Sequence, residues 1–432
     1  MTTMATEAIA GTERPSGQSL LLDLAQALHT VAVPSDVVVE LVDGAARRLG
    51  LEAHFVVMQS WVGGNVVASG GERVWFRPIP FDPHWRLERL GELLRLARGL
   101  VAGRVELDGA SRELREIVSR PNPYPQSLVV VAYSSYSAAV AARIGGGWLE
   151  VVVAFAVGLL AGFIHASSTR HEGVDLEKSF LGGLLGGLAV LVFTRFLPPF
   201  DFGSALFGGT TLLVPAMVIA IGTHELANGA LEAGSTRLAY GLFRFLMLAV
   251  GIAAAMRGWS VFAPLPGVTT SAGLPHAVVV ALLVTGGAAL VVCLQAPKRD
   301  VVWVVAAVLI AYEAQELTKL VLGERGAPFA AAFTLGAAAY WQARIPGHNP
   351  ATMLIPGLLQ LAPGFLGTRA VLHLLAGEGA GHETFFGVMF VALQLVTGLL
   401  AANLLFGKHL GQGAPASGTT GHRGDDPASR TV

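Results

Sequence analysis

The chain has 432 residues, of which 53% are apolar and 14% charged, and its mean hydropathy is +0.58. A soluble domain carries about 25% charged residues, and one this apolar would expose more hydrophobic surface than water tolerates. The 29 cations balance 30 anions, which argues against nucleic-acid binding, and the single Cys293 excludes cysteine-clustered metal sites. We therefore predict a protein embedded in membrane lipids.

Charged residues are concentrated before residue 127, which predicts a separate N-terminal domain. We predict a disordered segment over 1–19 and a small α/β domain over 20–126. The first residues lack the apolar core of a signal peptide, so this domain is expected in the cytoplasm. The expected elements are helices over 20–28, 35–49, 85–100 and 111–118, and strands over 53–58 and 74–79 separated by a Gly-rich turn around Gly63-Gly64.

A proline-rich run at 121–125 cannot continue a helix and predicts a stiff linker into the membrane. The following chain is a series of apolar runs, each near the roughly 20 residues that cross a hydrocarbon core. We predict about ten transmembrane helices and a disordered tail over 411–432. The expected spans are 127–143, 148–168, 179–197, 203–223, 238–256, 275–296, 300–322, 327–344, 349–373 and 384–407.

An internal similarity links the fourth and ninth predicted spans. Thr211-Leu-Leu-Val-Pro215-Ala-Met-Val218 is similar to Thr352-Met-Leu-Ile-Pro356-Gly-Leu-Leu359. Copies five spans apart face opposite ways across the bilayer, and Pro-interrupted helices in matching positions are typical of a transporter's central site. This predicts two inverted five-helix repeats, over 127–256 and 257–410. A packing kink at each proline is the alternative interpretation.

Several short sequences, in order along the chain, make it similar to the bacterial threonine/serine exporter family. They are Ser35-Asp-Val-Val-Val-Glu40, Leu49-Gly-Leu51, Pro121-Asn-Pro-Tyr124, Leu213-Val-Pro-Ala216, Gly229, Thr236-Arg-Leu238 and Leu361-Ala-Pro-Gly364. The resemblance implies an amino-acid exporter of the inner membrane, with a cytoplasmic domain followed by about ten helices in two halves. The family usually has Pro-Gly where this chain has Pro215-Ala216, and an acidic residue close after it where His224-Glu225 stands.

Ionisable side chains inside apolar spans are costly, so each suggests a role. The seventh span carries Glu313, Gln315, Glu316 and Lys319, spaced to share helix faces. A desolvated carboxylate there would exchange protons near neutrality, or bind an amino group. The alternative is that these side chains reach the outer interface.

The fourth span ends in a second polar group, His224, Glu225 and Asn228. Histidine suits proton coupling, whereas a wetted helix end is the alternative interpretation. We expect Arg244 to pair with Glu225 or Glu232. Gln360 and Gln394 lie in apolar runs and could offer hydrogen bonds to a substrate.

Enzyme motifs are missing from the sequence: His-Glu pairs lack a second zinc-binding histidine, and neither a nucleophile elbow nor a phosphate loop occurs. We predict no enzymatic activity and no cofactor. The first hypothesis is a secondary exporter of threonine, serine or similar small solutes, coupled to protons. The second is a membrane-anchored sensor or partner-binding protein, and the third is a channel. Gly-x3-small patterns suit close helix packing, so a homo-oligomer stays open.

Overall fold

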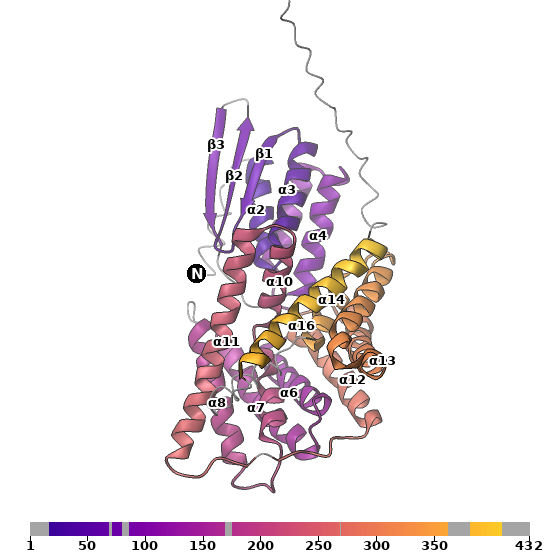
Figure 1. Cartoon of the computed structure of the whole chain (residues 1–432). Coiled ribbons are helices and arrows are strands. Elements are labelled where there is room, and N and C mark those ends of the chain that lie inside the picture. Colours follow the sequence, from indigo (N-terminus) through magenta and orange to yellow (C-terminus); the bar gives the residue numbers. More distant parts are fainter. Residues whose placement is uncertain are drawn as a thin grey trace, which may run out of the picture.

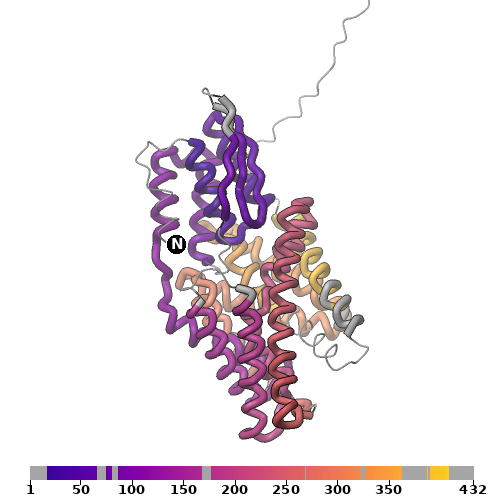
Figure 2. Tube along the Cα trace, turned by 90° about the vertical axis from the view of Figure 1, so that its left-hand side faces the viewer, coloured from indigo at the N-terminus to yellow at the C-terminus, as the bar shows by residue number. Residues whose placement is uncertain are grey.

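The computed structural model describes residues 17–68, 71–79, 86–168, 175–267, 269–361 and 381–407. It is mostly helical, with an N-terminal domain stacked on one end of a long helical region (Figure 1). Figure 2 shows the same stacking from the side. Residues 1–16 and the predicted tail over 411–432 lie outside the described residues, whereas 17–19 belong to the first helix.

The N-terminal domain has a leucine-rich core between four helices. These are α2 (Gly17–Thr30), α3 (Ser35–Arg48), α4 (Leu87–Val101) and α5 (Leu107–Ser119). Each has apolar residues at helical spacing, so one face of each helix is buried. Leu21, Leu24 and Leu28 of α2 are fully buried and share a core cluster with Leu93 and Leu96 of α4.

One side of these helices is covered by a three-stranded antiparallel sheet in the order β1-β2-β3. Its strands are β1 (Glu52–Val57), β2 (Trp61–Ala68) and β3 (Gly71–Pro78). The prediction of a turn at Gly63-Gly64 is wrong, because both glycines lie inside the central strand. A Cβ on Gly63 would be 2.7 Å from the Trp61 ring, and one on Gly64 would be 2.8 Å from the Phe55 ring. Both glycines therefore make room for aromatic rings packed over the sheet.

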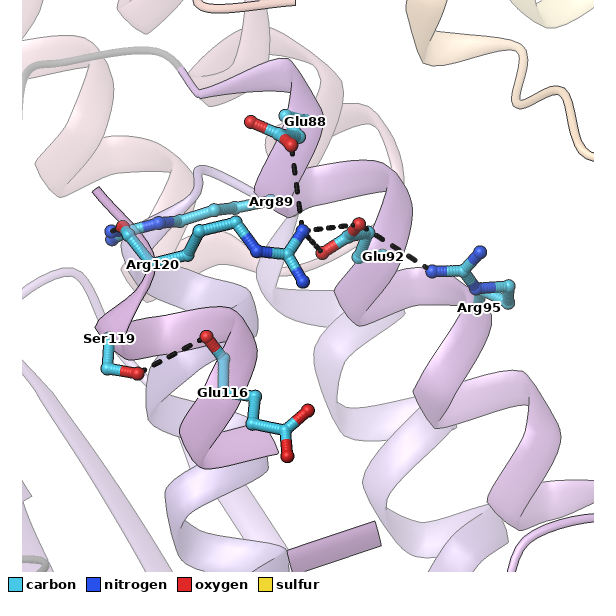
Figure 3. A network of polar contacts seen from close by, with 7 residues as sticks. All are labelled: Glu88, Arg89, Glu92, Arg95, Glu116, Ser119 and Arg120. Atoms are coloured by element: carbon cyan, nitrogen blue, oxygen red, sulfur yellow. Dashed lines mark hydrogen bonds and ion pairs between the residues drawn. The ribbon is translucent and has the colours of Figure 1, made fainter. Parts of the chain in front are cut away.

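The linker is attached to the N-terminal domain by an ion-pair network (Figure 3). Arg120, directly after α5, donates to both carboxylate oxygens of Glu92 at 2.8 Å and lies 3.6 Å from Glu88. Arg89 donates to the Arg120 carbonyl. Further on, the Tyr124 hydroxyl donates to the Ala296 carbonyl at 3.0 Å. The linker is therefore held at both ends, by Arg120 on the side of the N-terminal domain and by Tyr124 on the side of Ala296.

Beyond the linker every predicted span with described residues is helical. The elements are α6 (Gln126–Arg143), α7 (Trp148–Ser168), α8 (Asp175–Phe193), α9 (Phe202–Thr210), η1 (Thr211–Leu213), α10 (Ala216–Ala227), α11 (Leu231–Ser260), α12 (His276–Cys293), η2 (Lys298–Asp300), α13 (Val301–Gln342), α14 (Ala351–Leu361), α16 (Gly381–Ala402) and η3 (Asn403–Gly407). In the described part of the chain, five helices are long and apolar enough to cross a membrane, or six if one bent pair counts as a span. The figure of ten stays a prediction.

Two breaks interrupt these helices. Between η1 and α10 the chain bends by 62° at Val214-Pro215. In α13 the backbone leaves the helical region at Gly323, with φ 72° and ψ 175°, between the predicted spans 300–322 and 327–344. A positive φ of this kind favours glycine, which has no Cβ to clash.

Glycines bring α8 and α11 into close contact. A Cβ on Gly183 of α8 would lie 2.1 Å from the Leu248 carbonyl oxygen, and one on Gly251 of α11 would lie 2.1 Å from that of Phe180. A similar contact recurs between α13 and α16, where a Cβ on Gly398 would be 2.5 Å from the Phe329 carbonyl oxygen. Small residues at helix crossings allow this backbone approach in membrane proteins.

Candidate functional site

A buried hydrogen bond joins helices far apart in the sequence. The Tyr136 hydroxyl of α6 donates to the Gln360 amide oxygen of α14 at 3.2 Å. Tyr136 is 1% exposed and Gln360 is fully buried. The Gln360 amide nitrogen has no hydrogen-bond partner among the described residues. A buried donor without a partner is unfavourable, so this position favours a polar ligand beside it.

Two helical turns beyond Tyr136, Arg143 continues the polar side of α6. Its guanidinium donates to the Gln315 side-chain oxygen of α13 at 2.8 Å. Arg143 also interacts electrostatically with Glu316 and Tyr312, which both belong to α13. The Arg143–Gln315 hydrogen bond is thus a second polar contact between α6 and the helices that follow residue 256.

The predicted acidic residues of α13 are partnered and half-exposed. Glu316 accepts from Lys319 at 2.6 Å, and their side chains are 40% and 37% exposed. Glu313 lies 3.1 Å from His276 of α12 and is 38% exposed. The spacing argument correctly placed Lys319 beside Glu316, whereas sequence alone gave no signal for His276.

The two sequence-similar segments adopt different backbone conformations. Pro215 stands at the break before α10, whereas Pro356 is buried inside the continuous helix α14. Thr211–Leu213 forms a 3-10 turn, while Thr352 lies in an α-helix. Pro215 therefore interrupts a span as predicted, but the similarity does not by itself identify equivalent positions in two halves.

The Glu225 carboxylate accepts three hydrogen bonds from two residues that lie far apart in the sequence. The carboxylate accepts from the Arg237 guanidinium at 3.0 Å, and from the Ser35 backbone N–H and hydroxyl at 2.9 and 2.8 Å. Glu225 is fully buried and the Arg237 side chain is 3% exposed. Ser35 is the first residue of α3, whose helix dipole favours an anion there. This group therefore joins the N-terminal domain to α10 and α11.

The expected pairing of Arg244 is wrong. Its guanidinium donates to the Ser179 hydroxyl at 3.3 Å, and Arg237 takes the place beside Glu225. Arg237 lies near the start of α11, close to the end of α10. Arg244 is seven residues further along α11, which is about 10 Å along a helix axis, and therefore packs against α8.

Asn228, directly after α10, also contacts the N-terminal domain, and His224 contacts Asn228. Their side chains are 2.9 Å apart, as the i, i+4 spacing predicted, and the Asn228 amide donates to Asp36 at 2.9 Å. The predicted polar group at the end of α10 thus divides between a buried ion pair and an exposed contact with α3.

His29 of α2, near this contact, is buried, and burial followed by the positive charge of Arg237 lowers its pKa to about 4. Because the unfolded chain binds a proton below pH 6.5, stability from neutral His29 is complete above pH 6.5 and is lost as the pH falls toward 4. We expect the protein in detergent to lose about 2 kcal/mol between pH 7.5 and 5 through this group. The measurement is the thermal unfolding midpoint of wild type and His29→Gln at both pH values. Equal losses in the two proteins would contradict the assignment.

Residues 19–259, more than half of the chain, match the family described as "Putative threonine/serine exporter". The chain is 26% identical over 258 residues to "Pheromone-regulated membrane protein 10" of Pichia sorbitophila, covering 56% of this chain and 25% of that protein. It is 26% identical over 336 residues to "Probable threonine/serine exporter" of Mycobacterium tuberculosis, covering 73% and 62% respectively. No solved structure matches.

Proposed function

Because this chain belongs to the threonine/serine exporter family, we propose that it exports threonine, serine or similar small hydrophilic solutes as a secondary transporter. A multi-pass membrane protein of an exporter family has a small-molecule substrate, and the proposal includes no enzymatic conversion and no cofactor. We place it in a bacterial inner membrane with the N-terminal domain in the cytoplasm. The charged residues concentrated before residue 127 support an N-terminal domain that lies in water rather than in lipid.

The proposed architecture is two inverted five-helix halves, over 127–256 and 257–410. It is supported by a helix contact in the first half that has a counterpart in the second half. The third and fifth helices of each half meet through close glycine contacts, α8 with α11 and the second part of α13 with α16. The first helices, α6 and α12, pack against one another. A substrate path between such halves fits alternating access by rocking of one half against the other.

The observation that carries the proposed path is the buried Tyr136–Gln360 contact between the halves. Export of a polar solute needs hydrogen-bonding groups inside an apolar region, and both side chains are enclosed there. Arg143 with Gln315 continues the path toward Glu316 and Lys319. The helix N-terminus after Pro215 offers a positive dipole end for a substrate carboxylate.

Proton coupling is assigned to the carboxylates Glu313 and Glu316, with His224 as a further titratable group. Glu316 beside Lys319 and Glu313 beside His276 each join an acid to a base at short distance. In vesicles, an imposed pH gradient should accelerate solute efflux. Flux that is unaffected by the size and direction of that gradient would instead favour a channel.

The test of the proposed function is counterflow of radiolabelled amino acids in proteoliposomes, scanned across the twenty. We expect counterflow for threonine or serine, and a loss of at least about tenfold in Gln360→Leu, because a hydrogen-bonding group worth about 1–3 kcal/mol is removed from the path. The matched control is Thr397→Val, since the Thr397 hydroxyl is exposed and, within the part of the chain that the structure describes, bonds to carbonyls of its own helix. Counterflow with none of the amino acids would favour the membrane-anchored sensor, and equal flux in Gln360→Leu would remove that residue from the path.

A further inference from the structure

The N-terminal domain touches both proposed halves, and two of its contacts are held by hydrogen bonds. One contact is with the end of α12, the first helix of the second half. The other is with the end of α10, in the first half, where Glu225 is also bound by Arg237 of α11. A body attached to both halves has to respond when they move relative to one another.

The contact with α12 is made largely by backbone groups. The N–H groups of Leu87 and Glu88, at the start of α4, donate to the carbonyls of Leu294 and Gln295 at 3.0 and 3.2 Å. These are the groups that helix ends leave without intrahelical partners, so each helix end satisfies the other. The Tyr124 hydroxyl adds a bond to Ala296 at 3.0 Å. Separation here would leave several backbone groups without partners, which makes this contact the more permanent one.

The contact with α10 is made by side chains on the membrane side. Ser35 donates twice to Glu225, and Asp36 accepts from Asn228. If α3 moves away, Glu225 keeps its bond to Arg237, so the buried carboxylate does not lose its counter-charge. Ser35 and Asp36 lie at a helix start that water can solvate. This contact can therefore open without leaving an isolated buried charge.

We propose that the N-terminal domain is a strap across the two halves, fixed at α12 and released at Glu225 during each transport cycle. The proposal rests on the proposed alternating access of the two halves. Ser35 and Glu225 are positioning residues: they hold α10, which follows the break at Pro215, in the conformation described here. Release of Ser35 frees α10 to move while Arg237 stays with Glu225.

The first experiment measures opening of this contact without any transport assay. In a Cys293→Ser background, Ser35→Cys is labelled with a maleimide in permeabilised membranes. The matched control is Ser111→Cys, a similarly buried serine of the same domain: the two serines are 2% and 4% exposed. We expect Ser35→Cys to be labelled at least about tenfold faster, because its contact opens while the domain stays folded. Equal labelling rates would mean that both positions open only by unfolding, and would overturn the proposal.

The second experiment measures whether opening is needed for flux. Asp36 and Asn228 are 2.9 Å apart at their side-chain tips, so Asp36→Cys and Asn228→Cys can be joined by a short reducible bis-thiosulfonate reagent. We expect counterflow of labelled threonine by the double-cysteine protein to fall at least about tenfold on cross-linking and to recover on reduction, while the reagent leaves the rate of each single-cysteine variant at its value before treatment. Unchanged flux in the cross-linked protein would overturn the strap. Absence of flux in wild type would refute the proposed function, and the labelling rates would still decide whether the contact opens.

Discussion

Glu225→Ala is expected to destabilise the protein by about 3–5 kcal/mol, since it leaves the buried Arg237 guanidinium without its counter-charge. The variant also removes the acceptor for both Ser35 donors. A fall in the thermal unfolding midpoint of the purified protein in detergent would measure this loss. A midpoint within a degree or two of wild type would contradict the assignment of a buried ion pair.

Two controls separate the buried charge from other effects. In Glu225→Leu with Arg237→Met both charges are replaced by apolar groups, and much of the stability should return, because no isolated charge remains. Glu316→Ala removes a partner from the half-exposed pair with Lys319. Exposed pairs contribute about 0–1 kcal/mol, so this variant should change the midpoint little.

Gly251→Ala is expected to prevent normal packing of α8 against α11. The new methyl group would lie 2.1 Å from the Phe180 carbonyl oxygen and 2.8 Å from the Leu184 nitrogen, both of them backbone atoms. Since backbone cannot rotate out of the way, the helices must separate, at a cost of about 1–3 kcal/mol or more. The measurement is the yield of monodisperse protein in size-exclusion chromatography and its unfolding midpoint.

The matched control is Gly258→Ala, seven residues later on the same helix. A Cβ there would meet nothing within 4 Å. Because alanine favours a helix over glycine by about 1 kcal/mol, this variant should be as stable as wild type or more so. Equal behaviour of the two variants would show that α8 and α11 do not approach as closely as described.

Part of the candidate site followed from local spacing. The break at Pro215, the Glu316–Lys319 pair and the His224–Asn228 contact all involve residues within four positions of one another or a single proline. Partners across the fold were not predicted. The Tyr136–Gln360 bond spans 224 positions and the Ser35–Glu225 bond 190. The signals available were that Gln360 and Glu225 are polar residues in or beside apolar spans, and that Ser35 begins a predicted helix; neither signal names a partner.

The sequence by itself determined that this is a helical membrane protein and where most of its helices begin and end. That information is local, because apolar run length and prolines fix which segments can be helices in lipid. It took the folded chain to show that Gly63 and Gly64 belong to a central strand, that Arg237 rather than Arg244 binds Glu225, and that the N-terminal domain contacts α10 and the end of α12. These outcomes depend on which surfaces meet, and the periodicity of one segment carries no information about the segment packed against it.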